Sequence, residues 1–133
     1  MILVDTSVWI DYFNGVDNFH TTALDLGLIE GTAAIGDIIF LEILQGFRKN
    51  SDYKNTKTRL SRLKHYEMFG HRMVNNCAEN YRSLRRKGIT IRSTTDVTIA
   101  TFCIENKLPL LFKDKDFIPF INHLDLLPAP LKT

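Results

Sequence analysis

The sequence has few of the residues that hold zinc or cross-link small secreted domains. Its two cysteines, Cys77 and Cys103, lie far apart in apolar surroundings, and their spacing matches neither a zinc site nor a disulfide framework. The four histidines are scattered, and no two of them have the spacing of a metal-binding pair. We therefore expect reduced cysteines that pack in the interior, and no histidine metal site.

Long apolar runs, a strong net charge and a phosphate-binding glycine loop are also missing. No segment approaches the ~20 uninterrupted apolar residues of a membrane span, and residues 1–5 lack the basic and apolar regions of a signal peptide. The formal net charge is only +2, too small to indicate nucleic-acid binding by itself. Gly27, Gly31 and Gly36 satisfy neither nucleotide-binding fingerprint. We expect a cytoplasmic protein without a membrane partner.

The composition is that of one compact domain. The chain has 133 residues, of which 44% are hydrophobic and 24% charged. A folded chain of this length buries roughly two-thirds of its unfolded surface, so it forms a core without cross-links. We expect a single domain over residues 1–133.

Short apolar segments alternate with helical patterns along the chain. The alternation favours a parallel sheet that is covered by helices on both faces. The predicted strands are residues 2–4, 33–36, 66–69 and 108–112. The predicted helices are residues 8–13, 18–29, 38–47, 51–63, 73–87, one that begins at Thr94 and Thr95, and 114–121.

Acidic residues stand where the predicted strands end. Asp5 follows the first strand, and Asp114 and Asp116 follow the last. Asp96 lies in the first turn of the helix before that last strand, and Glu42 interrupts a helix that is otherwise apolar. Ligands of open parallel sheets bind beyond the carboxyl ends of the strands, so these acids are the candidate site.

Each acid has a structural alternative when it is taken alone. Asp5 and Asp96 are suited to capping helices, Glu42 to an ion pair with a neighbouring helix, and Asp114 and Asp116 to a solvated turn of alternating charge. Taken together they are harder to explain, because like charges ~4 Å apart repel by roughly 4 kcal/mol at an effective dielectric constant of 20. Protons or a hard divalent cation, Mg²⁺ or Mn²⁺, would relieve that repulsion.

Four segments of the sequence, in this order, resemble PIN-domain ribonucleases of the VapC toxin type. They are VDTSVWID at residues 4–11, LEILQG at 41–46, RRKGITI leading to TDVTIA at 85–100, and LLFKDKDF at 110–117. The resemblance implies an α/β protein, a three-layer α/β/α PIN-like domain around a central parallel sheet of four or five short strands.

The resemblance also implies an activity, a cofactor and partners. It makes Asp5, Glu42, Asp96 and Asp114 metal ligands and catalytic residues, with Asp116 as an auxiliary acid. Thr6 resembles the residue that supports the first aspartate of the family. The implied function is that of a toxin endoribonuclease, dependent on Mg²⁺ with Mn²⁺ able to substitute, which hydrolyses RNA phosphodiester bonds with a metal-activated water. Such toxins are usually homodimers and are inhibited by a cognate VapB-type antitoxin.

One position departs from the family pattern, and a few basic or aromatic residues suggest contacts. Phe112 stands where the family often has a threonine or serine, so a hydroxyl near the last acids is missing.

The candidates for RNA binding are Lys113, Lys115, Arg85 and Arg86. For the two arginines, the helix dipole also favours basic residues at the end of a helix. The aromatic set Trp9, Tyr12 and Phe13 fits core packing, and part of it fits an antitoxin or dimer contact.

Two other functions remain open at this point. A phosphatase of the haloacid dehalogenase type would use Asp5 as its nucleophile, but its motif requires a second acid two residues later, where this chain has Ser7. A catalytically weak PIN-like module would bind RNA or a protein without cutting. The complete set of acids argues against that module, because a binder has no need of mutually repelling carboxylates.

Overall fold

The computed structural model describes residues 1–131, and its centre is one sheet of four parallel strands. The strands are β1 (Ile2–Val4), β2 (Ala33–Gly36), β3 (Lys64–Tyr66) and β4 (Leu110–Leu111). Their order is β3-β2-β1-β4, and all three neighbouring pairs are parallel. The predicted parallel sheet is confirmed.

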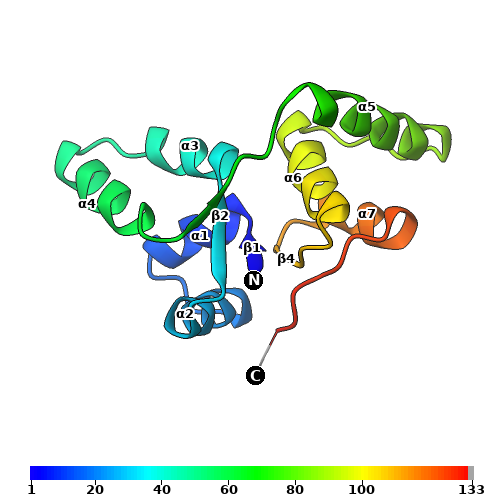
Figure 1. The fold of residues 1–133 in the computed structure, drawn as a ribbon. Helices are drawn as coiled ribbons and strands as arrows, with labels where there is room; N and C mark the ends of the chain where they lie inside the picture. The colour runs from blue at the N-terminus through cyan, green and yellow to red at the C-terminus, as the bar shows by residue number, and fades with distance from the viewer. Residues whose placement is uncertain (132–133) are drawn as a thin grey trace.

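Helices cover both faces of this sheet. Figure 1 shows α1 to α4 on one side of the strands and α5 to α7 on the other, which confirms the three-layer α/β/α architecture. The helices are α1 (Thr6–Phe13), α2 (Phe19–Glu30), α3 (Asp37–Gln45), α4 (Asn50–Leu60), α5 (His71–Arg86), α6 (Thr94–Glu105) and α7 (Ile118–Leu124), and a 3-10 helix, η1 (Lys115–Phe117), precedes α7. No helix within residues 1–131 has the length and apolarity that crossing a membrane requires.

The core lies where the helices pack on the strands. Leu3, Val4 and Leu110 are fully buried, as their positions in short central strands predict. Helix α6 is buried over seven consecutive residues, 97–103, because α5 covers the side of it that does not face the interior. Trp9 is also fully buried, so core packing accounts for its ring and it offers no free surface to a partner.

The sequence prediction was wrong at several element boundaries. The third strand is Lys64–Tyr66 and not residues 66–69, because it is an edge strand that pairs only with β2 and therefore tolerates exposed polar side chains. Ser93, and not Thr94 or Thr95, caps α6: the Asp96 N–H donates to its hydroxyl. The predicted final helix, 114–121, is divided into η1 and α7, with Pro119 in the first turn of α7.

Gly36 is required by a close approach at the end of β2. A Cβ atom at this position would lie 1.8 Å from the Sδ atom of Met68, which is fully buried. We therefore expect Gly36→Ala to lower the free energy of unfolding by about 1–3 kcal/mol, measured by urea denaturation. Gly70→Ala is the control, because a Cβ there meets nothing within 4 Å. Equal stability of the two variants would contradict this prediction.

Candidate metal centre

The candidate site forms at the carboxyl edge of the sheet, where the strand order reverses. The chain passes from β1 to β2 and β3 on one side, whereas β4 pairs on the other side of β1. Asp5 follows β1 and Asp114 follows shortly after β4, and the Asp5 N–H donates to the Leu111 carbonyl over 2.9 Å. The two strand ends therefore hold these two acids on neighbouring strands, as the rule for open parallel sheets predicts.

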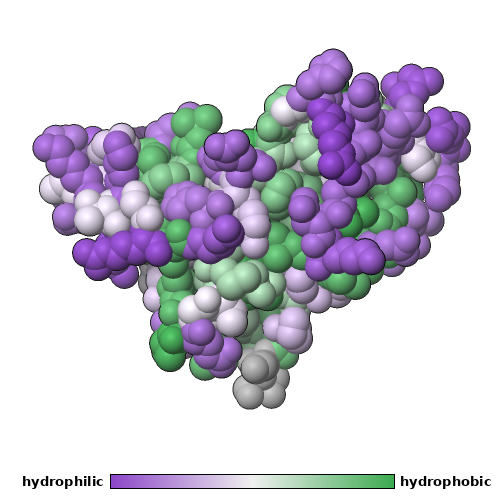
Figure 2. Space-filling view, viewed as in Figure 1, coloured by the Kyte–Doolittle hydropathy of each residue, from purple (hydrophilic) through white to green (hydrophobic). Residues whose placement is uncertain are grey.

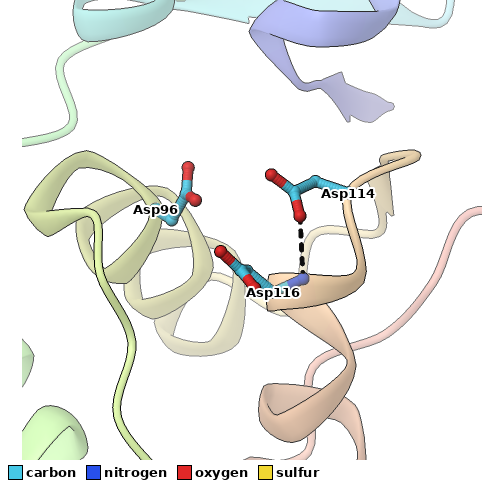
Figure 3. A group of neighbouring side chains, drawn as sticks. All are labelled: Asp96, Asp114 and Asp116. Atoms are coloured by element: carbon cyan, nitrogen blue, oxygen red, sulfur yellow. Dashed lines mark hydrogen bonds between the residues drawn. The ribbon is translucent and has the colours of Figure 1, made fainter.

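Three carboxylates come together between α6 and the segment after β4. One oxygen atom from each of Asp96, Asp114 and Asp116 can be chosen so that all three lie within 4.8 Å of one another. Figure 3 shows that Asp96, from the first turn of α6, faces the two other side chains across a common space. The Asp116 N–H donates to Asp114 Oδ1 over 2.9 Å, which fixes the second carboxylate beside the third.

Asp5 is almost completely buried. Its exposed fraction is 4%, and the hydroxyl of Ser7 donates to its Oδ2 over 2.8 Å. Although Asp5 occupies the N-cap position of α1, its side chain makes no capping hydrogen bond. Burial raises the pKa of Asp5, the Ser7 hydrogen bond opposes this increase, and the charge of Glu42 adds to it.

Glu42 is held by the first helix rather than by a cation. The Thr6 hydroxyl donates to Glu42 Oε1 over 2.7 Å, and no ion pair of Glu42 occurs among residues 1–131. Thr6 therefore contacts Glu42, and the hydroxyl that contacts the first aspartate belongs to Ser7. Sequence reasoning did not find this role of Ser7; the signal available was a hydroxyl two residues after an acid at a helix start.

The pKa of Asp96 is affected by the charges of all four other candidate acids. Its pKa is raised to about 7, first by burial and then by the negative charges of Asp5, Asp114, Asp116 and Glu42. The five acids that the sequence placed on separate segments therefore lie close enough to repel one another. We call these five residues the acid cluster.

The donor set of the acid cluster fits a hard divalent cation. All its side chains offer carboxylate oxygens, which are the ligands that Mg²⁺ and Mn²⁺ prefer. Within residues 1–131 the ion pairs are Arg72 with Glu105 and Lys113 with Asp11, so no lysine or arginine side chain neutralises the cluster through an ion pair. The residues of the acid cluster could therefore hold a divalent cation.

The basic residues predicted to bind RNA lie at unequal distances from the cluster. Lys113 is paired with Asp11, whereas Lys115 is exposed beside Asp114 and Asp116. Arg85 and Arg86 end α5, and Figure 1 shows that this end of the helix points away from the start of α6.

Phe112, which stands where the family often has a hydroxyl side chain, packs on Phe117 with ring centroids 5.4 Å apart.

The surface is hollowed at the end of the molecule where α3 and α6 begin. Figure 2 shows a notch at this edge, between the lobe formed over α3 and α4 and the lobe formed over α5. Hydrophilic and hydrophobic side chains both border the notch. The carboxyl ends of the strands face this side of the molecule, so an extended ligand has room to approach the cluster.

Comparison with known proteins identifies the family. The PIN domain family matches residues 2–119. The chain belongs to the PIN domain family. Ribonuclease VapC11 of Mycobacterium tuberculosis is 29% identical over 119 residues, which are 88% of this chain and 89% of that relative.

Solved structures share the fold. VapBC2 of Rickettsia felis, bound to a DNA fragment from its promoter, aligns with a TM-score of 0.75 at 22% identity, over 97% of this chain and 98% of that one. FitAcB of Neisseria gonorrhoeae aligns with a TM-score of 0.73 at 17% identity, over 98% and 97%. The resemblance found in the sequence is confirmed: the PIN domain family matches the chain, and a relative that covers most of it is named as a VapC ribonuclease.

The raised pKa of Asp96 makes the stability of this PIN domain depend on pH when no metal is bound. The pKa is 3.8 for an ordinary aspartate and about 7 in the folded state. Between these values the folded protein holds a proton that the unfolded chain loses, so the free energy of unfolding falls as the pH rises from about 4 to 7. Urea denaturation with a chelator present, at pH 5, 6 and 7.5, measures this slope.

The matched variant is Asp96→Asn, which keeps the size of the side chain but cannot titrate. We expect a shallower fall in its stability over the same pH range, with the remainder due to Asp5. An unchanged slope in Asp96→Asn would show that the acid cluster does not repel Asp96 in solution.

Proposed function

We propose that this PIN domain is a metal-dependent endoribonuclease of the VapC toxin type. The observation that carries the proposal is the convergence of four negative charges on Asp96, at the edge of the sheet where ligands of parallel sheets bind. A protein without a cation to hold has no use for such repulsion. The ribonuclease names of its relatives support the same activity.

The roles proposed for the residues follow from their positions. Asp5, Asp96, Asp114 and Glu42 would hold Mg²⁺, or Mn²⁺ in its place, and Asp116 would orient the attacking water. The cation would supply a more acidic water and neutralise the charge that develops on the phosphate oxygens. Thr6 and Ser7 keep Glu42 and Asp5 in fixed orientations through their hydroxyl groups.

The proposed reaction is hydrolysis of the RNA backbone. Water forms a bond to phosphorus, the bond from phosphorus to the 3′ oxygen breaks, and that oxygen takes a proton to leave as a hydroxyl. One product therefore carries a 5′-phosphate, and the 2′-hydroxyl takes no part. With RNA as its substrate, the protein would act in the cytoplasm.

RNA must be held by groups around the acid cluster rather than by the cluster itself. Contacts between cationic side chains and phosphates provide most of the affinity of nucleic-acid complexes. Lys115 is exposed next to the cluster, so we propose it as the nearest phosphate contact. Arg85 and Arg86 would contact RNA only at a distance from the bond that is cut, because α5 carries them away from α6.

The first test of this proposal is cleavage by the purified protein. We expect Mg²⁺ to support cleavage of RNA and a chelator to stop it. Asp5→Asn and Asp96→Asn should each lower the rate of RNA cleavage by about 100-fold or more. A loss of this size is usual when a group that helps to stabilise the charge of the transition state is removed. Asp52→Asn is the control, because Asp52 is an exposed acid in the first turn of α4.

Three results distinguish the proposal from its alternatives. Cleavage that a chelator does not affect would contradict metal dependence. RNA binding without cleavage, with Mg²⁺ present, would favour a PIN-like binding module. An acid-stable phosphate adduct on Asp5 would favour a phosphatase.

Asp5→Asn should also leave the free energy of unfolding of the metal-free protein unchanged or higher, because it removes a buried charge.

We extend the proposal to a protein partner. The structural neighbour from Klebsiella pneumoniae is a toxin-antitoxin complex, with 22% identity and a TM-score of 0.60 over 88% of this chain and 90% of that one. By this similarity, a cognate VapB-type antitoxin would inhibit the present chain. The family resemblance further implies a homodimer.

Growth of a bacterial host tests the toxin role. We expect expression of the chain to arrest growth because RNA is degraded, and co-expression of the small protein encoded beside it to relieve the arrest. Asp96→Asn, which removes one carboxylate of the acid cluster, should not arrest growth when it is expressed to the same level. Arrest by this variant would show that toxicity does not depend on the proposed site.

A further inference from the structure

Two acids of the cluster, the exposed Asp114 and the half-buried Asp116, are carried by a short segment that follows β4. Asp114 and Asp116 lie on the six residues between β4 and α7, and η1 is the only regular structure there. Inside this segment, the Asp116 N–H donates to Asp114 Oδ1 and the buried Phe117 anchors its end. These contacts fix the local turn, and the hydrogen bond from the Asp5 N–H to the Leu111 carbonyl fixes where the segment begins.

One polar side-chain contact joins this segment to another element, in addition to the apolar packing of the buried Phe117. Lys113 forms an ion pair with Asp11, which is 102 residues earlier in the sequence. Among the side-chain hydrogen bonds and ion pairs of residues 1–131, no other one joins residues 112–117 to a different element. The Asp11 side chain is 19% exposed, so the ion pair is partly shielded from solvent on the α1 side.

Asp11 is distinct from the acid cluster. The charges that raise the pKa of Asp96 belong to Asp5, Asp114, Asp116 and Glu42, and Asp11 is not among them. Helix α1, however, begins directly after its N-cap residue Asp5 and carries Asp11 in its last turn. The Asp11–Lys113 pair therefore joins the helix that starts at one candidate ligand to the residue immediately before another.

The pair also decides where the positive charge of Lys113 lies. A lysine one residue before Asp114 has a flexible side chain, and an unpaired ammonium group would be attracted to the repelling carboxylates beside it. In that position it would take the place of the cation. Asp11 gives the ammonium group a partner on α1 instead.

We propose that Asp11 and Lys113 are positioning residues: their ion pair sets the place of Asp114 and Asp116 opposite Asp5 and keeps the Lys113 ammonium group out of the acid cluster. This inference rests on the proposed function, since it concerns cation binding at the same site. It assigns Asp11 a role through Lys113 alone. A partly exposed ion pair contributes little to overall stability. We therefore expect loss of the Asp11–Lys113 pair to change cation binding by the acid cluster more than the free energy of unfolding.

The test is binding of Mn²⁺ to the full-length, metal-free protein, followed by electron paramagnetic resonance of the free ion. We expect Asp11→Asn to weaken Mn²⁺ binding about tenfold, as is typical when a residue that orients a ligand is changed. Lys113→Met should weaken Mn²⁺ binding less than Asp11→Asn does, because no ammonium group remains that could take the place of the cation in the acid cluster. In the Lys113→Met background, Asp11→Asn should have no further effect.

The control is Glu105→Gln, which breaks the Arg72–Glu105 pair between α5 and the end of α6 and should leave Mn²⁺ binding unchanged. Wild-type affinity in Asp11→Asn, or an equal loss in both backgrounds, would overturn the inference. A third result would also overturn it: Lys113→Met binds RNA more weakly and Asp11→Asn binds Mn²⁺ with normal affinity. Lys113 would then be an RNA contact and not a positioning residue. The titration needs no RNA, so failure of cleavage would count against the proposed function only.

Discussion

Repulsion among five carboxylates is the interaction on which the candidate site depends. Two parts of the fold hold them together against it. The ladder between β1 and β4 fixes the residues that lead to Asp5 and Asp114, and the buried length of α6 fixes Asp96. The apolar contacts of the strands and of α6 therefore oppose the electrostatic cost of the cluster. A chain of this length has enough apolar surface to do so without cross-links.

The two halves of the cluster are held in different ways. Asp5 is buried and accepts a hydrogen bond from the Ser7 hydroxyl, and Glu42 on α3 is oriented by the Thr6 hydroxyl of α1. Asp114 and Asp116 lie on a short exposed segment whose geometry depends on a turn and an ion pair. One half is therefore built into the core, whereas the other has fewer constraints.

The positions of the acids were predictable because strand ends and helix starts are local features. Asp5 and Asp114 follow apolar runs, and parallel strands bring such ends to one edge. The edge strand β3 was misplaced because its polar residues carry no apolar pattern. Which hydroxyl contacts which acid depends on side-chain rotamers, and the Asp11–Lys113 pair joins residues too far apart for any local pattern to indicate.

The overall charge of the chain conceals its distribution. Five of the fifteen acids lie in one cluster, although the seventeen lysines and arginines make the whole chain slightly basic. RNA that approaches this cluster meets its negative potential at close range, where salt screens least. Before a cation binds, that potential opposes the phosphate group that must enter. Under the proposed function, a bound cation would therefore favour the binding of RNA as well as the chemical step, because it would offset the negative potential of the acids.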